Sequence, residues 1–302
     1  MSASLPIALL GTGLLGTAIG QRLLQQGLTL RVWNRHPERL QPLVALGAEA
    51  CATAAEAVLP SRWVITALSD GGACRQVLLP ADDLRWQGQR VLQMGTIAPD
   101  ASRQLAEALP QRGAAYLEAP VLGSRPEALA GTLQILVGGD EDLYREALPL
   151  LRHLGPQPKW FGAVGSALET KLALNQLIAS LTHAFSLSLH LVQAAGVDVE
   201  QFMAVLRGSA LHAPTFDKKL PRLLADDFTH PNFPTAHLRK DLQLFLAAAR
   251  QHGLDTTGLA GLELLLDQAR GTPLDRLDYS ALHRLTGPAP PPPAPSAGPR
   301  NA

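Results

Sequence analysis

The spacing of apolar residues changes along the chain near residue 162. Before that point, short apolar runs alternate with stretches in which apolar residues recur every three or four positions, and turns rich in glycine separate them. After it, only the wider spacing continues. Short runs are typical of buried strands, and the wider spacing is typical of helices that bury one face. The pattern therefore predicts an α/β domain followed by an all-α domain.

In the first part, the predicted strands and helices alternate. We expect strands at residues 5–10, 28–34, 63–68, 90–94, 115–118 and 133–137, and helices at residues 17–27, 37–46, 54–59, 73–79, 99–112 and 141–154. In the second part, we expect helices at residues 166–195, 199–208, 220–225, 235–252, 259–270 and 279–285. Strands that alternate with helices form a doubly wound, mostly parallel sheet, whose ligands bind at the carboxyl ends of the strands. The loops at residues 11–16, 68–70 and 95–96, and the loop after residue 118, should therefore line one crevice.

The longest predicted helix, residues 166–195, begins the second part. It contains no Pro or Gly, and residues 172–197 carry no formal charge, so we expect most of its faces to be buried. Ser166 and Glu169 have the spacing of a capping box, which predicts where the helix starts. A membrane span would satisfy the same length test, but the polar residues along the helix argue against one.

Two polar side chains stand out on this apolar helix. Lys171 and Asn175 lie one turn apart, with Thr182 further along the same side. The chain has only five lysines and otherwise uses Arg for positive charge, and of these two residue types only Lys can release a proton in a protein. Burial and the positive end of the helix dipole should both lower the pKa of Lys171. Lys171 is therefore a candidate for proton transfer, although a lysine that only extends its ammonium group into water is an alternative.

The sequence GTGLLG at residues 11–16 directly follows the first predicted strand. Strand, glycine motif, helix and second strand fit within about thirty residues, which is the full context of a dinucleotide-binding unit. Gly11 would permit the tight turn, Gly13 the close approach of the backbone to a pyrophosphate, and Gly16 the close packing of helix on strand. We therefore predict a nicotinamide dinucleotide at the N-terminus of the first helix.

The end of the second predicted strand indicates which cofactor binds. An Asp or Glu there would accept hydrogen bonds from the ribose hydroxyls and repel a 2′-phosphate. This chain has Asn34 and Arg35 instead, followed by His36 and Arg39. Guanidinium groups suit a phosphate because they can bind it through two hydrogen bonds. We therefore predict NADP(H) in preference to NAD(H).

Composition argues against several other classes of protein. The 26 Lys and Arg residues balance the 26 Asp and Glu residues, so no excess charge attracts nucleic acid or an anionic membrane. Cys51 and Cys74 are the only cysteines and form no metal-binding motif, which argues against disulfides and zinc. The N-terminal residues lack the basic region of a signal peptide. We expect a soluble, cytoplasmic protein without a metal, with a disordered Pro-rich tail at residues 288–302.

Three further motifs occur in a characteristic order. EAPVLGSRPEALAGTLQILVGG spans residues 118–139, GSALETKLALNQ spans residues 165–176, and FPTAHLRKDL spans residues 233–242. Together with the glycine motif, they resemble the β-hydroxyacid dehydrogenase family, which includes the 3-hydroxyisobutyrate dehydrogenases. The likeness is closest to its glyoxylate/succinic semialdehyde reductase branch. It covers residues 7–285.

The resemblance implies two domains and a set of site residues. A Rossmann domain would span residues 1–164, and an all-α substrate and oligomerisation domain would span residues 165–287, joined by the long interdomain helix. Lys171 would be the general acid or base and Asn175 its positioning partner. The implied cofactor contacts are Gly11, Gly13, Leu14, Leu15, Gly16, Asn34, Arg35, Leu68, Ser69, Thr96 and Lys240. The implied substrate contacts are Leu122, Gly123, Ser124, Phe233 and Asp241.

The chain departs from the family pattern at two positions. Leu122 stands where the family usually has a serine that helps to bind the substrate carboxylate, and Gly95 stands where a serine commonly precedes the threonine. Gly123 and Ser124 still offer backbone N–H groups and a displaced hydroxyl, so an anion site can survive there. Both changes make the pocket less polar and favour a substrate with some apolar bulk over glyoxylate.

These features predict an NADPH-dependent oxidoreductase. It would reduce a small aldehyde or 2-oxo acid of the semialdehyde type to the hydroxy acid, with a hydride from NADPH and a proton from Lys171. One alternative is an imine reductase of similar architecture, although such enzymes generally lack a lysine at this helix position. Another is a non-catalytic NADP-binding interaction protein. The long apolar helix, which needs cover from more than one side, predicts a homodimer or homotetramer.

Overall fold

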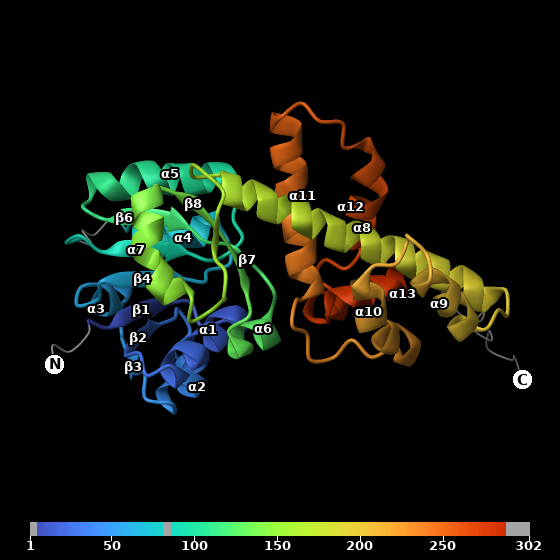
Figure 1. Cartoon of the computed structure of the whole chain (residues 1–302), viewed down its shortest axis with the longest axis horizontal. Helices are drawn as coiled ribbons and strands as arrows, with labels where there is room; N and C mark the ends of the chain where they lie inside the picture. Colours follow the sequence, from blue (N-terminus) through green and yellow to red (C-terminus); the bar gives the residue numbers. More distant parts are fainter. Residues whose placement is uncertain (1–4, 81–85, 288–302) are drawn as a thin grey trace, which may run out of the picture.

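The computed structural model describes residues 5–80 and 86–287 of the chain. It has an N-terminal part built on a sheet and a C-terminal part built of helices, and the long helix α8 (Ser166–Ala194) runs from one to the other (Figure 1). The predicted fold class, a Rossmann-type sheet followed by a helical domain, is therefore confirmed. The predicted Pro-rich tail at residues 288–302 lies outside the described residues.

Among the described residues, nine strands form the sheet, in the order β3-β2-β1-β4-β5-β6-β8-β7, with β9 beside β8. They are β1 (Ile7–Leu10), β2 (Leu30–Trp33), β3 (Glu49–Ala50), β4 (Trp63–Thr66), β5 (Arg90–Gln93), β6 (Ala115–Glu118), β7 (Val121–Leu122), β8 (Gln134–Gly139) and β9 (Lys159–Trp160). The strands from β3 to β6 pair in parallel, whereas β8 is antiparallel to β6 and β7. The strand order reverses between β1 and β4, and ligands of such sheets bind at the carboxyl ends of the strands at this point.

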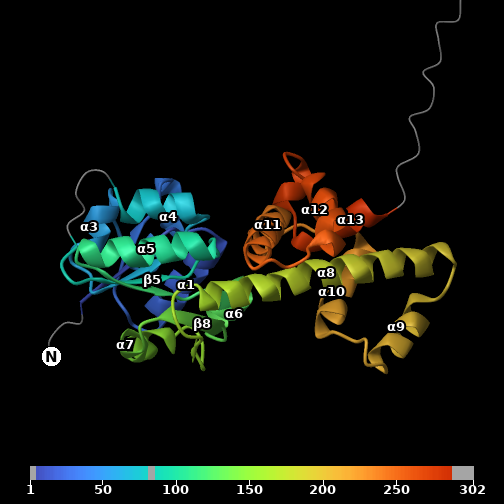
Figure 2. The same ribbon diagram turned by 90° about the horizontal axis from the view of Figure 1, so that it is seen from above.

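Helices cover both faces of the sheet (Figure 2). One face carries α3 (Ala54–Val58), α4 (Gly71–Leu78) and α5 (Pro99–Gln111), and the other carries α1 (Leu14–Gln25), α2 (Gln41–Val44) and α7 (Glu141–Leu151). Successive strand residues point to opposite faces. Accordingly, Ile7 and Leu9 belong to one buried cluster, and Ala8 and Leu10 belong to the other.

Helix α8 is the centre of the C-terminal part. Figure 2 shows α11 (Thr235–Gln251), α12 (Ala260–Asp267) and α13 (Leu282–Thr286) on one side of it, and α9 (Val199–Arg207) and α10 (Pro214–Ala225) on another. Short 3-10 turns lie at Thr257–Leu259, Pro273–Arg276 and Tyr279–Ala281. Ala179 and Phe185 of α8 belong to two different buried clusters of this part. The helix therefore organises the packing on both sides.

Some elements differ from the predicted ones. β3, β7 and β9 have two residues each and α6 (Arg125–Ala130) has six, so they are too short to show a period in the sequence. Helix α10 begins at Pro214 rather than at residue 220. The prediction was wrong there because Pro221 lies inside the helix, whereas proline is usually tolerated only in the first turn.

Helix α8 is less buried than its composition suggests. Leu177, Leu187 and Leu191 are 51%, 53% and 71% exposed, so the expectation that most of its faces are buried is wrong for the single chain. Among the described residues, α8 is the one helix long and apolar enough to cross a membrane, a test that core helices of soluble proteins also pass. Its other side packs against α11 and α13.

The start of α8 also differs from the prediction. Gly165 is the N-cap residue, and the capping box expected between Ser166 and Glu169 does not form. Glu169 Oε1 lies 2.6 Å from the Arg103 guanidinium group of α5 instead. The first backbone N–H groups of the helix donate hydrogen bonds to the buried carboxyl group of Glu118, from the sheet. Glu118, which is distant in the sequence, therefore satisfies the start of α8 in place of the predicted capping box.

Candidate active site

Polar side chains of α8 and α11 are buried together where the two parts meet. Lys171 and Asn175 of α8 are 6% and 1% exposed, and Asp241 of α11 is 2% exposed. The Asn175 Nδ2 group donates a hydrogen bond of 2.6 Å to Asp241 Oδ2. Asn175 Oδ1 has no hydrogen-bond partner among the described residues. A buried acceptor without a partner is costly, so this oxygen is a natural contact for a ligand or a neighbouring cation.

Lys240 connects this group to the sheet. Its Nζ atom lies 2.9 Å from Asp241 Oδ1 and donates a hydrogen bond to the backbone carbonyl of Thr96, just after β5. Lys240 is therefore paired with Asp241, yet it also reaches the carboxyl end of the sheet, where the crevice was predicted. The structure brings Lys171, Asn175, Lys240, Asp241 and Thr96 together at one place.

The environment of Lys171 suits proton transfer. Burial lowers the pKa of Lys171 from its ordinary value of 10.5 to about 8, while the Asp241 carboxylate opposes the shift and the Lys240 ammonium group adds to it. An amine with a pKa near the operating pH can both donate and accept a proton. The alternative in which Lys171 extends into water does not hold, because the side chain is buried.

The glycine loop has the shape that a pyrophosphate requires. Gly11 has a φ of 97°, and a Cβ atom there would lie 2.6 Å from the carbonyl oxygen of Ala67. A Cβ atom on Gly16 would lie 2.0 Å from the Gly11 carbonyl oxygen, whereas one on Gly13 would meet no atom within 4 Å. Helix α1 begins at Leu14, and no side chain caps its first N–H groups. These open N–H groups fit a dinucleotide phosphate.

Asn34 and Arg35 follow β2, next to the glycine loop. The Asn34 Nδ2 group donates a hydrogen bond of 2.9 Å to the Thr12 hydroxyl, and Asn34 Oδ1 accepts one of 2.9 Å from the His36 N–H group. Asn34 therefore holds the turn together instead of pointing a free amide at a ligand. Arg35 and Arg39 are exposed on that turn. The guanidinium groups are thus the ones presented to solvent.

Leu68 and Ser69 follow β4 and lie beside the loop after β5. The Ser69 hydroxyl donates a hydrogen bond of 2.6 Å to Asp70, which caps α4 by accepting a 2.8 Å bond from the Ala73 N–H group. A Cβ atom on Gly95 would lie 2.6 Å from the Leu68 carbonyl oxygen. The glycine at position 95 therefore has a packing reason of its own, because the two loops approach closely there.

The predicted substrate segment turns at Gly123. Leu122 ends β7 and is partly exposed, and Gly123 has a φ of 124°. The backbone N–H group and the hydroxyl of Ser124 both donate to Glu127 Oε2, at 2.8 and 2.9 Å. The bond from the Ser124 N–H group is one half of the capping box that starts α6, and the other half is the Glu127 backbone N–H group, which donates to the Ser124 hydroxyl. The displaced hydroxyl that we expected to be free for a substrate carboxylate is therefore occupied.

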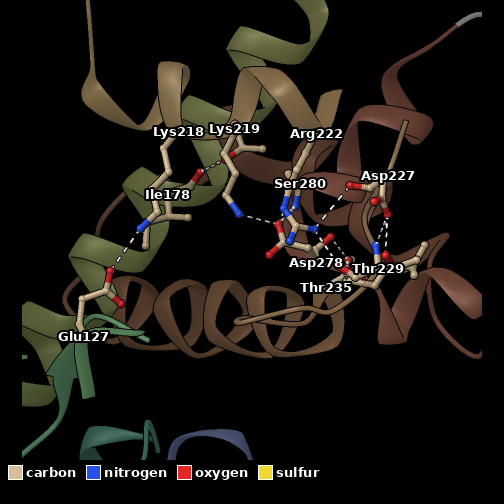
Figure 3. Close-up of polar contacts among 12 residues, drawn as sticks. Glu127, Ile178, Lys218, Lys219, Arg222, Asp227, Thr229, Thr235, Asp278 and Ser280 are labelled. Carbon is tan, nitrogen blue, oxygen red and sulfur yellow. Dashed lines mark hydrogen bonds and ion pairs between the residues drawn. The ribbon is translucent and has the colours of Figure 1, made fainter. Parts of the chain in front are cut away.

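Glu127 also links the two parts of the chain, as Figure 3 shows. Its Oε1 atom lies 3.3 Å from the ammonium group of Lys218 on α10. Burial alone would raise the pKa of Glu127, but hydrogen bonds from Ser124 and the charge of Lys218 outweigh it and lower the pKa to about 2. A carboxylate that stays ionised at this place would repel a second anion. This makes Ser124 a poor contact for a substrate carboxylate.

The remaining predicted contact, Phe233, precedes α11. Its ring packs against Tyr279, with the centroids 5.7 Å apart. The hydrogen bonds and ion pairs of the described residues do not tie Leu122, Gly123 or Phe233 to the group around Lys171.

Sequence reasoning missed the roles of Glu118 and Glu127, although residues 124–127 carry the same S-x-x-E signature that was assigned to residues 166–169. Within the described part of the chain, no group of three or more His, Cys, Asp and Glu residues is placed to hold a metal ion.

Comparison with known proteins agrees with this geometry. Residues 6–165 match the family model described as the NAD binding domain of 6-phosphogluconate dehydrogenase. Residues 165–286 match the model described as NAD-binding of NADP-dependent 3-hydroxyisobutyrate dehydrogenase. Glyoxylate/succinic semialdehyde reductase 1 of Arabidopsis thaliana is 31% identical over 279 residues, which cover 91% of this chain and 96% of that protein.

Two solved structures have a similar fold over most of the chain. The 3-hydroxyisobutyrate dehydrogenase of Mycobacterium tuberculosis, solved with L-serine, is 25% identical with a TM-score of 0.84, covering 93% of this chain and 98% of that one. An imine reductase of Aspergillus terreus, solved with NADPH4 and dibenz[c,e]azepine, is 28% identical with a TM-score of 0.64, covering 93% and 99%.

The fold, the open glycine loop and the matching family models define an NAD(P)-dependent oxidoreductase. The chain belongs to the family of 3-hydroxyisobutyrate dehydrogenase-like β-hydroxyacid dehydrogenases, as the resemblance predicted.

Proposed function

We propose that the chain reduces a small aldehyde or 2-oxo acid of the semialdehyde type to the hydroxy acid, with NADPH as the reductant and Lys171 as the proton donor. The observation that carries the proposal is the buried Lys171, whose pKa is lowered to about 8, beside the Asn175–Asp241 pair. The likeness to a glyoxylate/succinic semialdehyde reductase supports the substrate class.

In this proposal each polar residue has a separate task. The nicotinamide, when bound, supplies the hydride to the carbonyl carbon. The Lys171 ammonium group donates a proton to the carbonyl oxygen as negative charge develops there. Asn175 is held by Asp241 and keeps an unpaired Oδ1 atom, which would accept a hydrogen bond from the Lys171 ammonium group and orient it. In the oxidative direction, neutral Lys171 accepts the hydroxyl proton.

Arg35 would provide the preference for NADPH over NADH. We expect Arg35→Ala to weaken NADPH binding about tenfold or more, because a charge-assisted contact with the 2′-phosphate is lost. NADH carries no 2′-phosphate, so its dissociation constant should stay unchanged and serves as the internal control. Fluorescence titration with each nucleotide measures both values. Equal weakening of NADH and NADPH binding would show that Arg35 does not recognise the phosphate.

Leu122 would favour substrates with apolar bulk next to the reacting carbon. We expect Leu122→Ser to raise kcat/KM for glyoxylate about tenfold, since a hydroxyl can donate to the substrate carboxylate and such a bond contributes about 1.5–3 kcal/mol. Leu122→Ala is the matched control, because it makes the same space without a donor. Steady-state assays with glyoxylate and succinic semialdehyde measure the ratio. If both variants change it equally, space and not hydrogen bonding sets the preference.

The most direct test of the proposed function is a substrate screen that follows the nicotinamide absorbance with NADPH and with NADH. Small aldehydes, semialdehydes, 2-oxo acids and cyclic imines belong in the panel, because the likeness to an imine reductase keeps imine reduction as a second candidate. The proposal expects turnover of semialdehydes with NADPH. Turnover of cyclic imines without turnover of any aldehyde would replace it.

The exposed apolar stripe on α8 supports the assembly that we propose, a homodimer or homotetramer. Leu177, Leu187 and Leu191 would be covered by a second copy, since large exposed apolar patches usually mark interfaces. Light scattering of the purified chain measures the mass, and a monomer at micromolar concentration would contradict the proposed assembly.

We further propose a cytoplasmic location, with a small-molecule substrate and no nucleic-acid or membrane partner. Cell fractionation tests the location.

A further inference from the structure

The buried carboxyl group of Glu118 connects the sheet to the start of α8. Glu118 is the last residue of β6 and is 0% exposed. Its Oε1 atom accepts hydrogen bonds from the backbone N–H groups of Gly165, Ala167 and Leu168, at 2.8, 2.9 and 3.2 Å. Its Oε2 atom accepts one of 2.7 Å from the Ser102 hydroxyl. Donors from α5 and α8 therefore converge on one side chain.

These contacts suit a carboxylate better than an amide. The Ser102 hydroxyl lies 2.7 Å from the Tyr116 hydroxyl, so Tyr116 can donate to Ser102 while Ser102 donates to Glu118. The first N–H groups of a helix lack partners within the helix and favour a negative charge. An amide at position 118 would have to point its NH2 group at Ser102 or at the helix, which reverses or breaks this order of donors.

The position of Glu118 bears on both sides of the reaction site. Lys171 lies one helical turn after Ala167 and Leu168, so its backbone follows directly from the N–H groups that Glu118 holds. In the other direction along the chain, only residues 119–121 separate Glu118 from Leu122. One side chain thus connects the segment of the proposed substrate contact with the helix of the proposed proton donor.

We propose that Glu118 is a positioning residue for the reaction. It fixes the rotation of α8 about its axis and its position along that axis, and so places the Lys171 ammonium group at the reacting carbonyl. This inference rests on the proposed function, in which Lys171 transfers the proton. Glu118 itself touches neither substrate nor cofactor and acts through Lys171. A misplacement of about 1 Å in a reacting group can cost about 10²-fold in rate.

A double-mutant cycle between Glu118 and Lys171 tests the inference. Glu118→Gln should lower kcat by about 10- to 100-fold in the otherwise unchanged chain, and by less than about twofold in the Lys171→Ala background. The dissociation constant for NADPH should change less than about twofold in both, because the glycine loop follows β1, on the far side of β4 and β5 from β6. Glu146→Gln is the matched control, since that carboxylate pairs with Arg90 on the outside of the same domain.

The outcomes separate the inference from the proposed function. An equal loss from Glu118→Gln in both backgrounds would overturn the inference alone, because the residue would then act independently of Lys171. Near-normal turnover of the Lys171→Ala chain would overturn the proposed function as well. If Glu118→Gln does not fold, Glu118→Asp keeps the charge but is too short to reach both Ser102 and α8. Its partial loss of kcat should likewise vanish in the Lys171→Ala background, and a loss that persists there would overturn the inference.

Discussion

Replacing Lys171 with alanine is expected to lower kcat for aldehyde reduction by about 10²–10⁴-fold, which is the usual contribution of a general acid. Lys171 is the buried amine in this group whose pKa is lowered to about 8. In the proposed function, its removal would leave the developing alkoxide without a proton donor. NADPH binding should persist, because the glycine loop and Arg35 are untouched. Steady-state kinetics and a fluorescence titration with NADPH measure the two quantities separately.

Two further variants make this result specific. Lys171→Met keeps most of the length and apolar volume of the side chain, so it should lose as much turnover as Lys171→Ala while disturbing the packing of α8 less. Lys159→Ala removes an exposed lysine of β9 and should retain full turnover. Substantial turnover in Lys171→Met would show that the amine is not the proton donor, and would redirect the search to other titratable groups near Asp241.

The fold was predictable because its main signals are local. Each strand of four residues or more coincides with a short apolar run in the sequence, and the glycine motif at residues 11–16 falls between a strand and a helix. These features depend only on residues that are close in the sequence, so they can be recognised without knowledge of the tertiary contacts. The two-residue strands β3, β7 and β9 carry no such signal, because their pairing is decided by the strands beside them.

The start of α8 shows why the local reading of the site was incomplete. Residues 124–127 and 166–169 both read S-x-x-E, but only the first pair forms a capping box. At the second, Arg103 attracts Glu169, and Glu118 satisfies the helix N–H groups from 47 to 50 residues away. No spacing in the sequence reveals a partner at that distance.

Lys171 and Asn175, by contrast, were found from the sequence because they are polar residues one turn apart on an apolar helix. The family resemblance gave Asp241 only as a substrate contact, and no feature of the sequence predicted its hydrogen bond with Asn175. The structure shows Asp241 bonded to Asn175 and close to Lys240. Its buried carboxylate therefore shapes the electrostatics of the site, whether or not it also meets the substrate.

Asp241→Asn is expected to move the pH dependence of the reaction to lower pH. The Asp241 carboxylate raises the pKa of Lys171 against the effect of burial, so without it that pKa should fall below about 8 by at least about one unit. In the proposed function, reduction needs protonated Lys171, so its rate should fall as the pH rises through the pKa. At pH 8 the variant should therefore reduce its substrate about fivefold more slowly, because a drop of one unit from a pKa of about 8 lowers the protonated fraction from about one half to about one tenth.

Oxidation of the hydroxy acid provides the internal check, since in the same proposal it needs neutral Lys171 and its rate should rise through the same pKa. In Asp241→Asn, the falling limb of reduction and the rising limb of oxidation should both move to lower pH. Asp267→Asn on α12 is the matched control and should leave both limbs in place, because that carboxylate is 40% exposed and pairs with Arg270 at 2.7 Å. Lower rates in Asp241→Asn without movement of either limb would mean that Asp241 acts only by holding Asn175, and that Lys171 does not titrate in the pH profile.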